Sequence, residues 1–190
     1  PYIFFKENAN KAHALNGIGK VKFSNLCTEI MQVSQVSDIE IYGKEDTIRY
    51  GISCNLGSLN IATVMDNKRI KETVKTAMRA LTVVSDVTNI EMVPSIAKAN
   101  RELHSVGLGA MNLHGYLAKS FIMYESTEAL DFANTFFMMM NYYSLEASME
   151  IAKERGRTFI GFEKSSYADG TYFDMYLNRD YMPKTEKIKE

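Results

Sequence analysis

One helical pattern in the second half of the chain constrains its fold most strongly. Ser126 can cap the start of this helix, and Gly156, which follows Lys153 and Arg155, fits a C-terminal stop. About 30 residues at roughly 1.5 Å each make a rod of roughly 45 Å, which needs a larger body to pack on. Small and apolar side chains at three- and four-residue spacing form its predicted buried stripe: Leu130, Ala133, Phe137, Met140, Ser144, Ala147 and Ile151.

Further helices are predicted in the part of the chain that precedes the long helix. Asp66 can cap a helix over residues 67–87, which carries apolar residues at helical spacing. Pro94 suits the first turn of another helix, and a third is predicted over residues 105–119. A short helix is expected within residues 1–16, before the break at Gly17, Ile18 and Gly19.

The remaining segments read as extended or irregular. Residues 21–33 and 50–56 are predicted to be extended, residues 37–46 to form a loop, and the part after Gly156 to be irregular. The sequence therefore predicts an α/β chain that is predominantly helical in its second half. Because no linker or repeat interrupts it, residues 1–190 are expected to form a single partial domain.

Composition excludes several classes of function. Apolar residues make up 46% and charged residues 24%, with a net charge of -1, which is ordinary for a soluble globular protein and leaves no basic face for nucleic acid. No apolar run approaches the roughly 20 residues of a membrane span, and the start has no signal-peptide pattern. A cytoplasmic location is expected. Because the first residue is Pro1, the chain is expected to begin inside a longer polypeptide.

The sharpest chemical pattern is Asn25-Leu26-Cys27-Thr28-Glu29. In an extended backbone, alternate residues point to one side, so an amide, a thiol and a carboxylate would line one surface. An amide can hydrogen-bond a substrate hydroxyl, a carboxylate can accept its proton, and a thiol can act as a nucleophile or hydrogen-atom abstractor. The structural alternative is a buried cysteine between two solvent-facing polar residues.

The other candidate groups are weaker. Cys54 lies among small and amide side chains, either as a reactive thiol or as an ordinary buried cysteine. Two cysteines are too few for a disulfide scaffold, and His104 and His114 are too far apart along a helix for a metal pair, so no metal site is expected.

Taken together, several short sequence segments resemble the catalytic, large (alpha) subunit of ribonucleotide reductases. Ser24 to Ile30 (SNLCTEI) and Ile52 to Asn60 (ISCNLGSLN) resemble the active-site strands of that family. Leu103 to Tyr116, Tyr142 to Ser144 and Glu154 to Gly156 are similar to its class Ib subtype. The resemblance covers essentially the whole chain.

The resemblance implies part of a ten-stranded α/β barrel with a central finger loop that carries a thiyl radical. By this resemblance, Cys27 removes the 3′ hydrogen of the ribose, Glu29 is the base at the 3′ hydroxyl, and Asn25 hydrogen-bonds the 2′ and 3′ oxygens. Residues Asn25, Leu26, Cys27, Thr28 and Glu29 would bind the substrate. Cys54 would belong to the redox pair that reduces the 2′ position, with its partner cysteine upstream and outside this chain.

The resemblance also implies partners and cofactors. The substrate would be a ribonucleoside diphosphate. A metal-containing small (beta) subunit would supply the radical, and a thioredoxin- or glutaredoxin-like protein would supply electrons to a homodimer. This subunit would need no metal of its own, and nucleotide effectors would bind outside this chain, which alone should be inactive. The alternatives from other classes are a non-catalytic helical interaction domain with core cysteines and a cysteine hydrolase using Cys27, which needs a histidine base.

Overall fold

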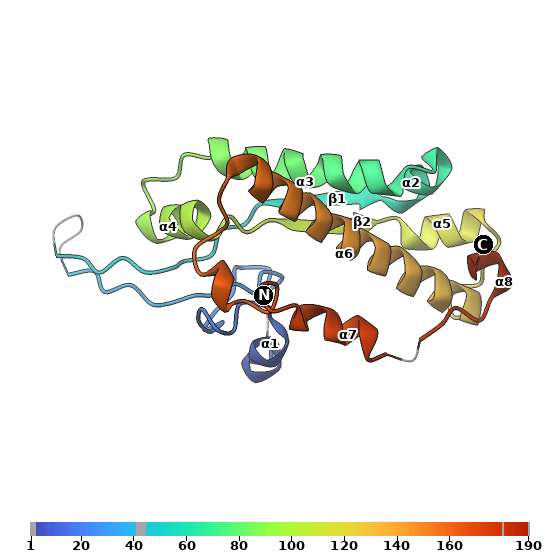
Figure 1. The fold of residues 1–190 in the computed structure, drawn as a ribbon, viewed down its shortest axis with the longest axis horizontal. Coiled ribbons are helices and arrows are strands. Elements are labelled where there is room, and N and C mark those ends of the chain that lie inside the picture. The colour runs from blue at the N-terminus through green and yellow to red at the C-terminus, as the bar shows by residue number, and fades with distance from the viewer. Residues whose placement is uncertain (1–2, 41–44, 180, 190) are drawn as a thin grey trace. The chain divides into compact units, whose positions relative to one another are not determined.

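The structure is a computed structural model that describes residues 3–40, 45–179 and 181–189. Within these residues, every helix is too short or too polar to cross a lipid bilayer. The elements follow in the order α1 (Lys6–Ala12), β1 (Leu56–Asn60), α2 (Ile61–Asn67), α3 (Ile70–Val87), α4 (Pro94–Leu103), β2 (Gly107–Met111), α5 (Leu113–Lys119), α6 (Thr127–Arg155), η1 (Phe162–Lys164), η2 (Thr171–Phe173), α7 (Asp174–Leu177) and α8 (Glu186–Lys189) (Figure 1).

The chain divides into two compact units. Unit 1 consists of Pro1–Asn55, Thr82–Gly107 and Thr158–Arg179, and unit 2 consists of Leu56–Leu81, Leu108–Arg157 and Asp180–Glu190. The single partial domain expected over residues 1–190 stays a prediction.

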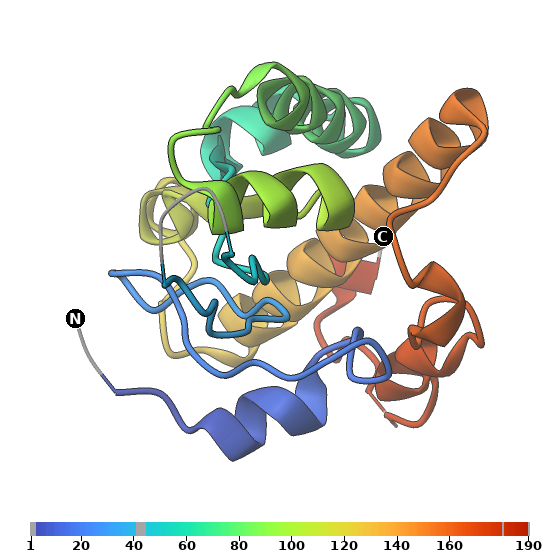
Figure 2. The ribbon, with the colours of Figure 1, turned by 90° about the vertical axis from the view of Figure 1, so that its left-hand side faces the viewer.

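Unit 1 is built around two extended segments, residues 31–38 and 47–55, which pair in antiparallel fashion. The Gln35 N–H donates to the Tyr50 carbonyl at 2.9 Å, and Asp38 and Thr47 form a β-bridge. Figure 2 shows α4 alongside these segments, where Val33 packs against buried residues of the helix. Part of the predicted 37–46 loop, residues 41–44, lies outside the described residues.

Close backbone approach fixes the start of α4 on the extended segment. The Gly51 N–H donates to the Ser95 carbonyl at 3.0 Å, and a Cβ on Gly51 would lie 3.2 Å from the Ile96 nitrogen. Only glycine leaves room for this contact without a shift of the backbone. The prediction that Pro94 opens a helix is confirmed.

Unit 2 holds the small sheet, in which β1 pairs with β2, and the packed pair of helices α2 and α5 (Figure 1). The predicted helix over residues 105–119 is wrong in its first half, because residues 107–111 form β2 and α5 begins only at Leu113. Gly107 and Gly109 are poor helix formers, and Gly109 lies against Ser58 of β1. Pairing with β1 therefore stabilises residues 107–111 as a strand.

The predicted helix over residues 67–87 also needs a correction at its start. α3 begins at Ile70, and a separate helix, α2, precedes it and is capped by the Asn60 side chain, which accepts from the Thr63 N–H. Asp66 is no N-cap: its carboxylate pairs instead with Lys119 at 2.6 Å.

The long helix α6 is confirmed with both of its caps. The Ser126 hydroxyl accepts from the Ala129 N–H at 3.1 Å, and Gly156 ends the helix in the left-handed conformation at φ 62°. The predicted stripe is partly wrong, because Leu130 is 61% exposed and Phe137 is 42% exposed.

The buried face of α6 is rotated from the predicted stripe and retains only part of it. Its buried apolar residues are Ala129, Phe132, Phe136, Met140 and Ala147. Phe132 stacks on Tyr116 of α5 with ring centroids 4.5 Å apart. Apolar residues lie all around α6, so spacing alone could not select the face that aromatic stacking fixes.

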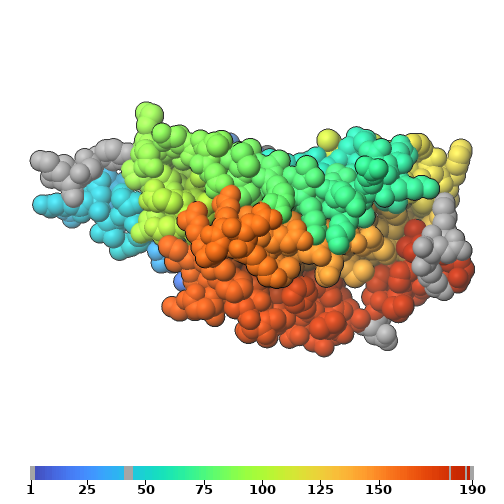
Figure 3. Space-filling model, turned by 45° about the horizontal axis from the view of Figure 1, so that its top comes forward, coloured from blue at the N-terminus to red at the C-terminus, as the bar shows by residue number. Residues whose placement is uncertain are grey.

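Charged side chains join α3 to the second half of α6 within unit 2. Lys75 pairs with Glu146 at 2.8 Å and with Glu150 at 2.6 Å, and Arg79 pairs with Glu154 at 2.6 Å. Figure 3 shows the atoms of these two stretches in contact on one face. Partly exposed pairs of this kind stabilise only slightly, and they mainly fix the register of the two helices.

Asp131 of α6 is buried and holds the segment after residue 180 on the helix. Its carboxylate accepts from the hydroxyls of Thr185 and Tyr181, each at 2.6 Å, and from the N–H groups of Lys184 and Thr185, each at 2.9 Å. These hydrogen bonds, led by that from Thr185, hold the pKa of Asp131 well below its ordinary range. Asp131 is therefore ionised near neutral pH and latches this segment.

We predict that Asp131→Asn opens the segment in a pH-dependent way. A carboxylate whose folded pKa is depressed stabilises the fold above its ordinary pKa, near 4, and this contribution disappears as pH falls further. Hydrogen exchange of the peptide over residues 181–189 in the whole protein should be faster in the variant at neutral pH. The difference from the parent should shrink as pH falls below about 4, toward the lowered pKa of Asp131. Asp169→Asn, in unit 1, is the control; a pH-independent difference at Asp131 would contradict the latch.

Candidate functional site

Residues 24–30 form a tight turn rather than the predicted extended segment. The Thr28 N–H donates to the Asn25 carbonyl at 3.1 Å, and Thr28 has φ 68°. The Asn25 side chain closes the turn by accepting from the Ile30 N–H at 3.1 Å, and the Ser24 hydroxyl donates to the Ile30 carbonyl at 2.7 Å. Such local hydrogen bonds compete with extended structure, and here they prevail.

The turn stores backbone strain at Thr28. A β-branched residue with positive φ is an outlier that costs on the order of 1–3 kcal/mol and persists only where its surroundings fix it. The neighbouring hydrogen bonds of Asn25 and Ser24 supply that fixation. Strain of this kind concentrates at functional sites, which makes the turn a candidate on structural grounds alone.

The turn brings Asn25 and Glu29 together. In the predicted extended segment, these side chains would have met because alternate residues point to one side. The Asn25 side-chain amide donates to Glu29 Oε1 at 2.7 Å, which orients the carboxylate. Leu26 and Cys27, at the tip of the turn, are exposed. The predicted pairing of amide and carboxylate therefore exists, but it arises from a turn.

The second segment brings Cys54 to the same carboxylate. Residues 51–55 alternate: Gly51, Ser53 and Asn55 are buried, whereas Cys54 faces outward. The Cys54 sulfur lies 4.0 Å from Glu29 Oε1. Partial desolvation of the thiol, the negative charge of Glu29 and the neighbouring Cys27 together raise the pKa of Cys54. Both cysteines are free.

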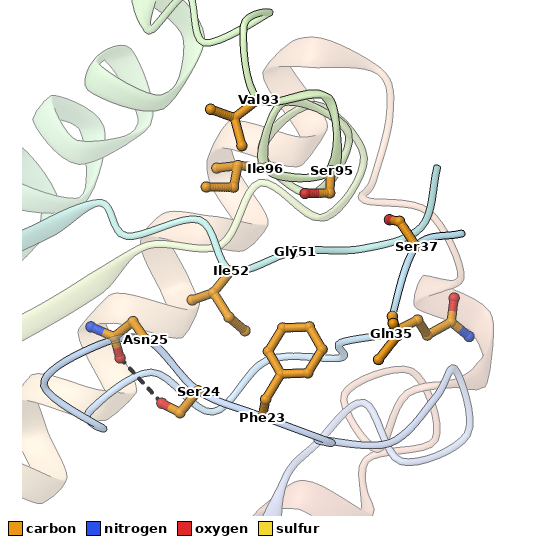
Figure 4. Close-up of a pocket in the computed structure, with 11 residues that line it drawn as sticks. Phe23, Ser24, Asn25, Gln35, Ser37, Gly51, Ile52, Val93, Ser95 and Ile96 are labelled. Carbon is orange, nitrogen blue, oxygen red and sulfur yellow. Dashed lines mark hydrogen bonds between the residues drawn. The ribbon is translucent and has the colours of Figure 1, made fainter. Parts of the chain in front are cut away.

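An open pocket of about 470 Å³ adjoins this cluster in unit 1. Figure 4 shows Phe23 and Ile52 pointing into it, with Asn25 and Ser24 at one side. Of the predicted site residues only Asn25 lines this pocket; Cys27, Glu29 and Cys54 do not. The prediction that Asn25, Cys27 and Glu29 line one surface stays a prediction.

The alternative functions find little support in this geometry. Both cysteines are exposed, so neither fills the core as the interaction-domain hypothesis requires. Among the described residues no hydrogen bond joins a histidine to Cys27, as a cysteine hydrolase needs. His13 is the histidine nearest to Cys27 in the sequence, and its pKa is lowered mainly by burial. Residues 3–40, 45–179 and 181–189 contain no group of three or more metal-ligating side chains placed to hold an ion.

Sequence reasoning missed a buried polar network directly beneath Cys54. The Asn100 side chain of α4 accepts hydrogen bonds from Ser53, Asn55 and Ser85, each at 2.9 Å. A signal was present in the sequence, because Asn100 lies three residues from both Ala97 and Leu103 and therefore shares their apolar face of the helix. A polar residue at a core position of a helix calls for partners elsewhere in the fold.

This chain is similar in sequence and in fold to known proteins. A family model described as the ribonucleotide reductase barrel domain matches residues 1–190. The ribonucleoside-diphosphate reductase subunit alpha of Bacillus subtilis is 59% identical over 188 residues, which are 99% of this chain and 27% of that protein. The subunit alpha of Mycoplasma pneumoniae is 45% identical over 193 residues, covering 100% of this chain and 26% of that protein.

A solved structure gives the same result. The alpha subunit of the class Id ribonucleotide reductase of Actinobacillus ureae superposes with a TM-score of 0.66 and 27% identity, covering 80% of this chain and 28% of that chain. The predicted α/β barrel fragment is confirmed, whereas the class Ib subtype stays a prediction. The chain spans about a quarter of the length of the relatives it matches, and it belongs to the ribonucleotide reductase barrel-domain family.

Proposed function

We propose that the protein containing this chain reduces ribonucleoside diphosphates to deoxyribonucleoside diphosphates. One observation carries the proposal. The Glu29 carboxylate lies between the Asn25 amide at 2.7 Å and the Cys54 thiol at 4.0 Å, at a strained turn that also exposes Cys27. The reduction requires a base, a hydrogen-bonding amide, a radical-forming thiol and a pair of reducing thiols. The chain supplies all of these except the second reducing thiol.

Each residue has a distinct role in the proposed reaction. Cys27, as a thiyl radical, takes the 3′ hydrogen of the ribose, and Glu29 takes the proton of the 3′ hydroxyl. The 2′ hydroxyl then leaves as water, assisted by Asn25 as a hydrogen-bond donor. Two thiols, of which Cys54 is one, give two electrons and two protons and become a disulfide. One proton completes the departing water, and the other is added with the electrons at the 2′ carbon. Cys27 finally returns its hydrogen to the 3′ carbon and Glu29 returns its proton to the 3′ oxygen, so the radical and the base are both regenerated.

The raised pKa of Cys54 suits this role. A thiol that must give a proton to the departing hydroxyl has to be protonated before the reaction. Burial of the thiol and, after it, the neighbouring Glu29 carboxylate favour the protonated form. The same carboxylate is within reach to accept a proton from the substrate. In the proposed reaction the Glu29 carboxylate therefore acts as the base and also favours the thiol form of Cys54.

The proposal extends to partners beyond this chain. A metal-containing small subunit would generate the radical, so this subunit would hold no metal of its own. A thioredoxin- or glutaredoxin-like protein would reduce the disulfide after each turnover. We further propose a homodimer in the cytoplasm, with nucleotide effectors bound outside this chain.

We predict that Cys27→Ala in the whole protein abolishes nucleotide reduction. The side chain is exposed and small, so its loss should leave folding and binding of the small subunit unchanged. The measurement is deoxynucleotide formation with small subunit, reductant and labelled substrate. Substrate affinity and small-subunit binding of the same preparation serve as controls. Turnover above background would remove the radical role of Cys27.

Cys54→Ser should separate the redox role from the radical role. Hydrogen abstraction by Cys27 should continue, but the 2′ position has lost a reductant, so the substrate radical should decay with release of the free base. The assay measures deoxynucleotide and free base from the same incubation. Normal deoxynucleotide yield over many turnovers, with thioredoxin as the sole reductant, would exclude Cys54 from the redox pair.

A further inference from the structure

We propose that Asn100 is a positioning residue that holds Cys54 at the site. The proposal deepens the proposed function, on which the redox role of Cys54 rests. Asn100 lies in α4 and has no contact with the Cys54 sulfur. It instead binds the side chains of the two residues that flank Cys54.

The geometry of this contact is unusually convergent. Asn100 Oδ1 accepts from Ser53 Oγ, Asn55 Nδ2 and Ser85 Oγ, each at 2.9 Å, and all four residues are buried. The Asn100 amide nitrogen donates to the Ser85 carbonyl at 2.8 Å, which fixes the plane of the amide. A single side chain thereby ties α4 to the end of α3 and to both neighbours of Cys54 within unit 1.

Further hydrogen bonds secure the same two flanking residues. The Gln32 side chain donates to the Ser53 carbonyl at 2.6 Å and accepts from the Ser53 N–H at 3.2 Å. The Asn55 carbonyl accepts from the Gly107 N–H at 2.8 Å. Because side chains alternate along an extended chain, fixing residues 53 and 55 inward forces residue 54 outward, toward Glu29.

This constraint has a chemical purpose in a cysteine that cycles between thiol and disulfide. A disulfide forms only when the two Cα atoms lie within about 7 Å and the Cβ vectors converge. The contact between Cys54 and Glu29 likewise depends on where residue 54 points. A buried polar network resists displacement more strongly than apolar packing does, because each broken hydrogen bond leaves an unpaired group.

The test uses the resting whole subunit, without substrate or small subunit. Alkylation by iodoacetamide is followed as a function of pH, with mass spectrometry of the separate peptides that carry Cys54 and Cys27. Asn100→Leu keeps the volume of the side chain and removes all its hydrogen bonds. Asn100→Asp keeps an acceptor toward Ser53 and Asn55. Ser165→Ala, which loses a buried hydroxyl in the same unit outside the network, is the matched control.

Burial and, after it, the charge of Glu29 raise the Cys54 pKa. Glu29→Gln calibrates the experiment, since it removes that charge without altering the network. If Asn100 positions Cys54, Asn100→Leu should shift the Cys54 profile to lower pH in the same direction. At about pH 7.5 the rate ratio of Cys54 to Cys27 should rise roughly threefold or more. Asn100→Asp should restore only part of the parent ratio, because it keeps the acceptor but loses the N–H that donates to the Ser85 carbonyl. Ser165→Ala should leave the ratio unchanged.

Ser53→Ala, which removes one tether and leaves Asn100 in place, serves as the second variant if Asn100→Leu fails to fold. It should raise the same ratio by less. An unchanged ratio in a folded Asn100→Leu or Ser53→Ala protein would overturn the proposal. A parallel rise at Cys27 and Cys54 would overturn it equally, because that result indicates general loosening.

Turnover provides a second, independent readout. Asn100→Leu should lower kcat and leave KM for the ribonucleoside diphosphate unchanged, because Asn100 touches neither the turn at Cys27 nor the pocket. The alkylation result does not depend on a redox role for Cys54. Normal turnover in Cys54→Ser would therefore refute the proposed function alone, whereas an unshifted alkylation profile would refute the positioning role alone.

Discussion

The buried amide of Asn100 is the interaction on which unit 1 most depends. It joins α4, the end of α3 and the extended segment through Cys54, and its oxygen gathers three donors at 2.9 Å. Without it, the buried hydroxyls of Ser53 and Ser85 would lose their acceptor, which costs roughly 1–3 kcal/mol for each group left unpaired, whereas Asn55 would keep its hydrogen bond to the Ser105 carbonyl. Burial of these polar groups fixes which side chains of residues 51–55 face inward, and therefore where Cys54 points.

The turn at residues 25–29 supplies the other half of the site. Its geometry comes from side chains acting on their own backbone, since Asn25 accepts from the Ile30 N–H and donates to Glu29. The left-handed Thr28 shows that this conformation is maintained against a local cost. Two segments far apart in sequence thus meet at one carboxylate, each held by hydrogen bonds of its own.

Sequence predicted best what local signals determine. The helix α6 was correct at both ends because Ser126 and Gly156 act through their own backbone neighbourhood. The candidate residues Asn25, Glu29 and Cys54 do meet, although their roles stay predictions. The failures depend on partners distant in sequence: strand pairing overrode helix at Gly107–Met111, and aromatic stacking selected the buried face of α6. Asn100 was missed because its partners lie up to 47 residues away.

The most direct test is a structure of the whole subunit with a ribonucleoside diphosphate bound. If the cluster is the catalytic site, the Cys27 sulfur should face the 3′ carbon of the ribose, and the Glu29 carboxylate should hydrogen-bond the 3′ hydroxyl. Cys54 should approach the 2′ carbon from the opposite side of the ring, with its flanking residues still bound to Asn100. A ribose bound elsewhere, or one from which Cys27 and Glu29 both point away, would contradict the assignment.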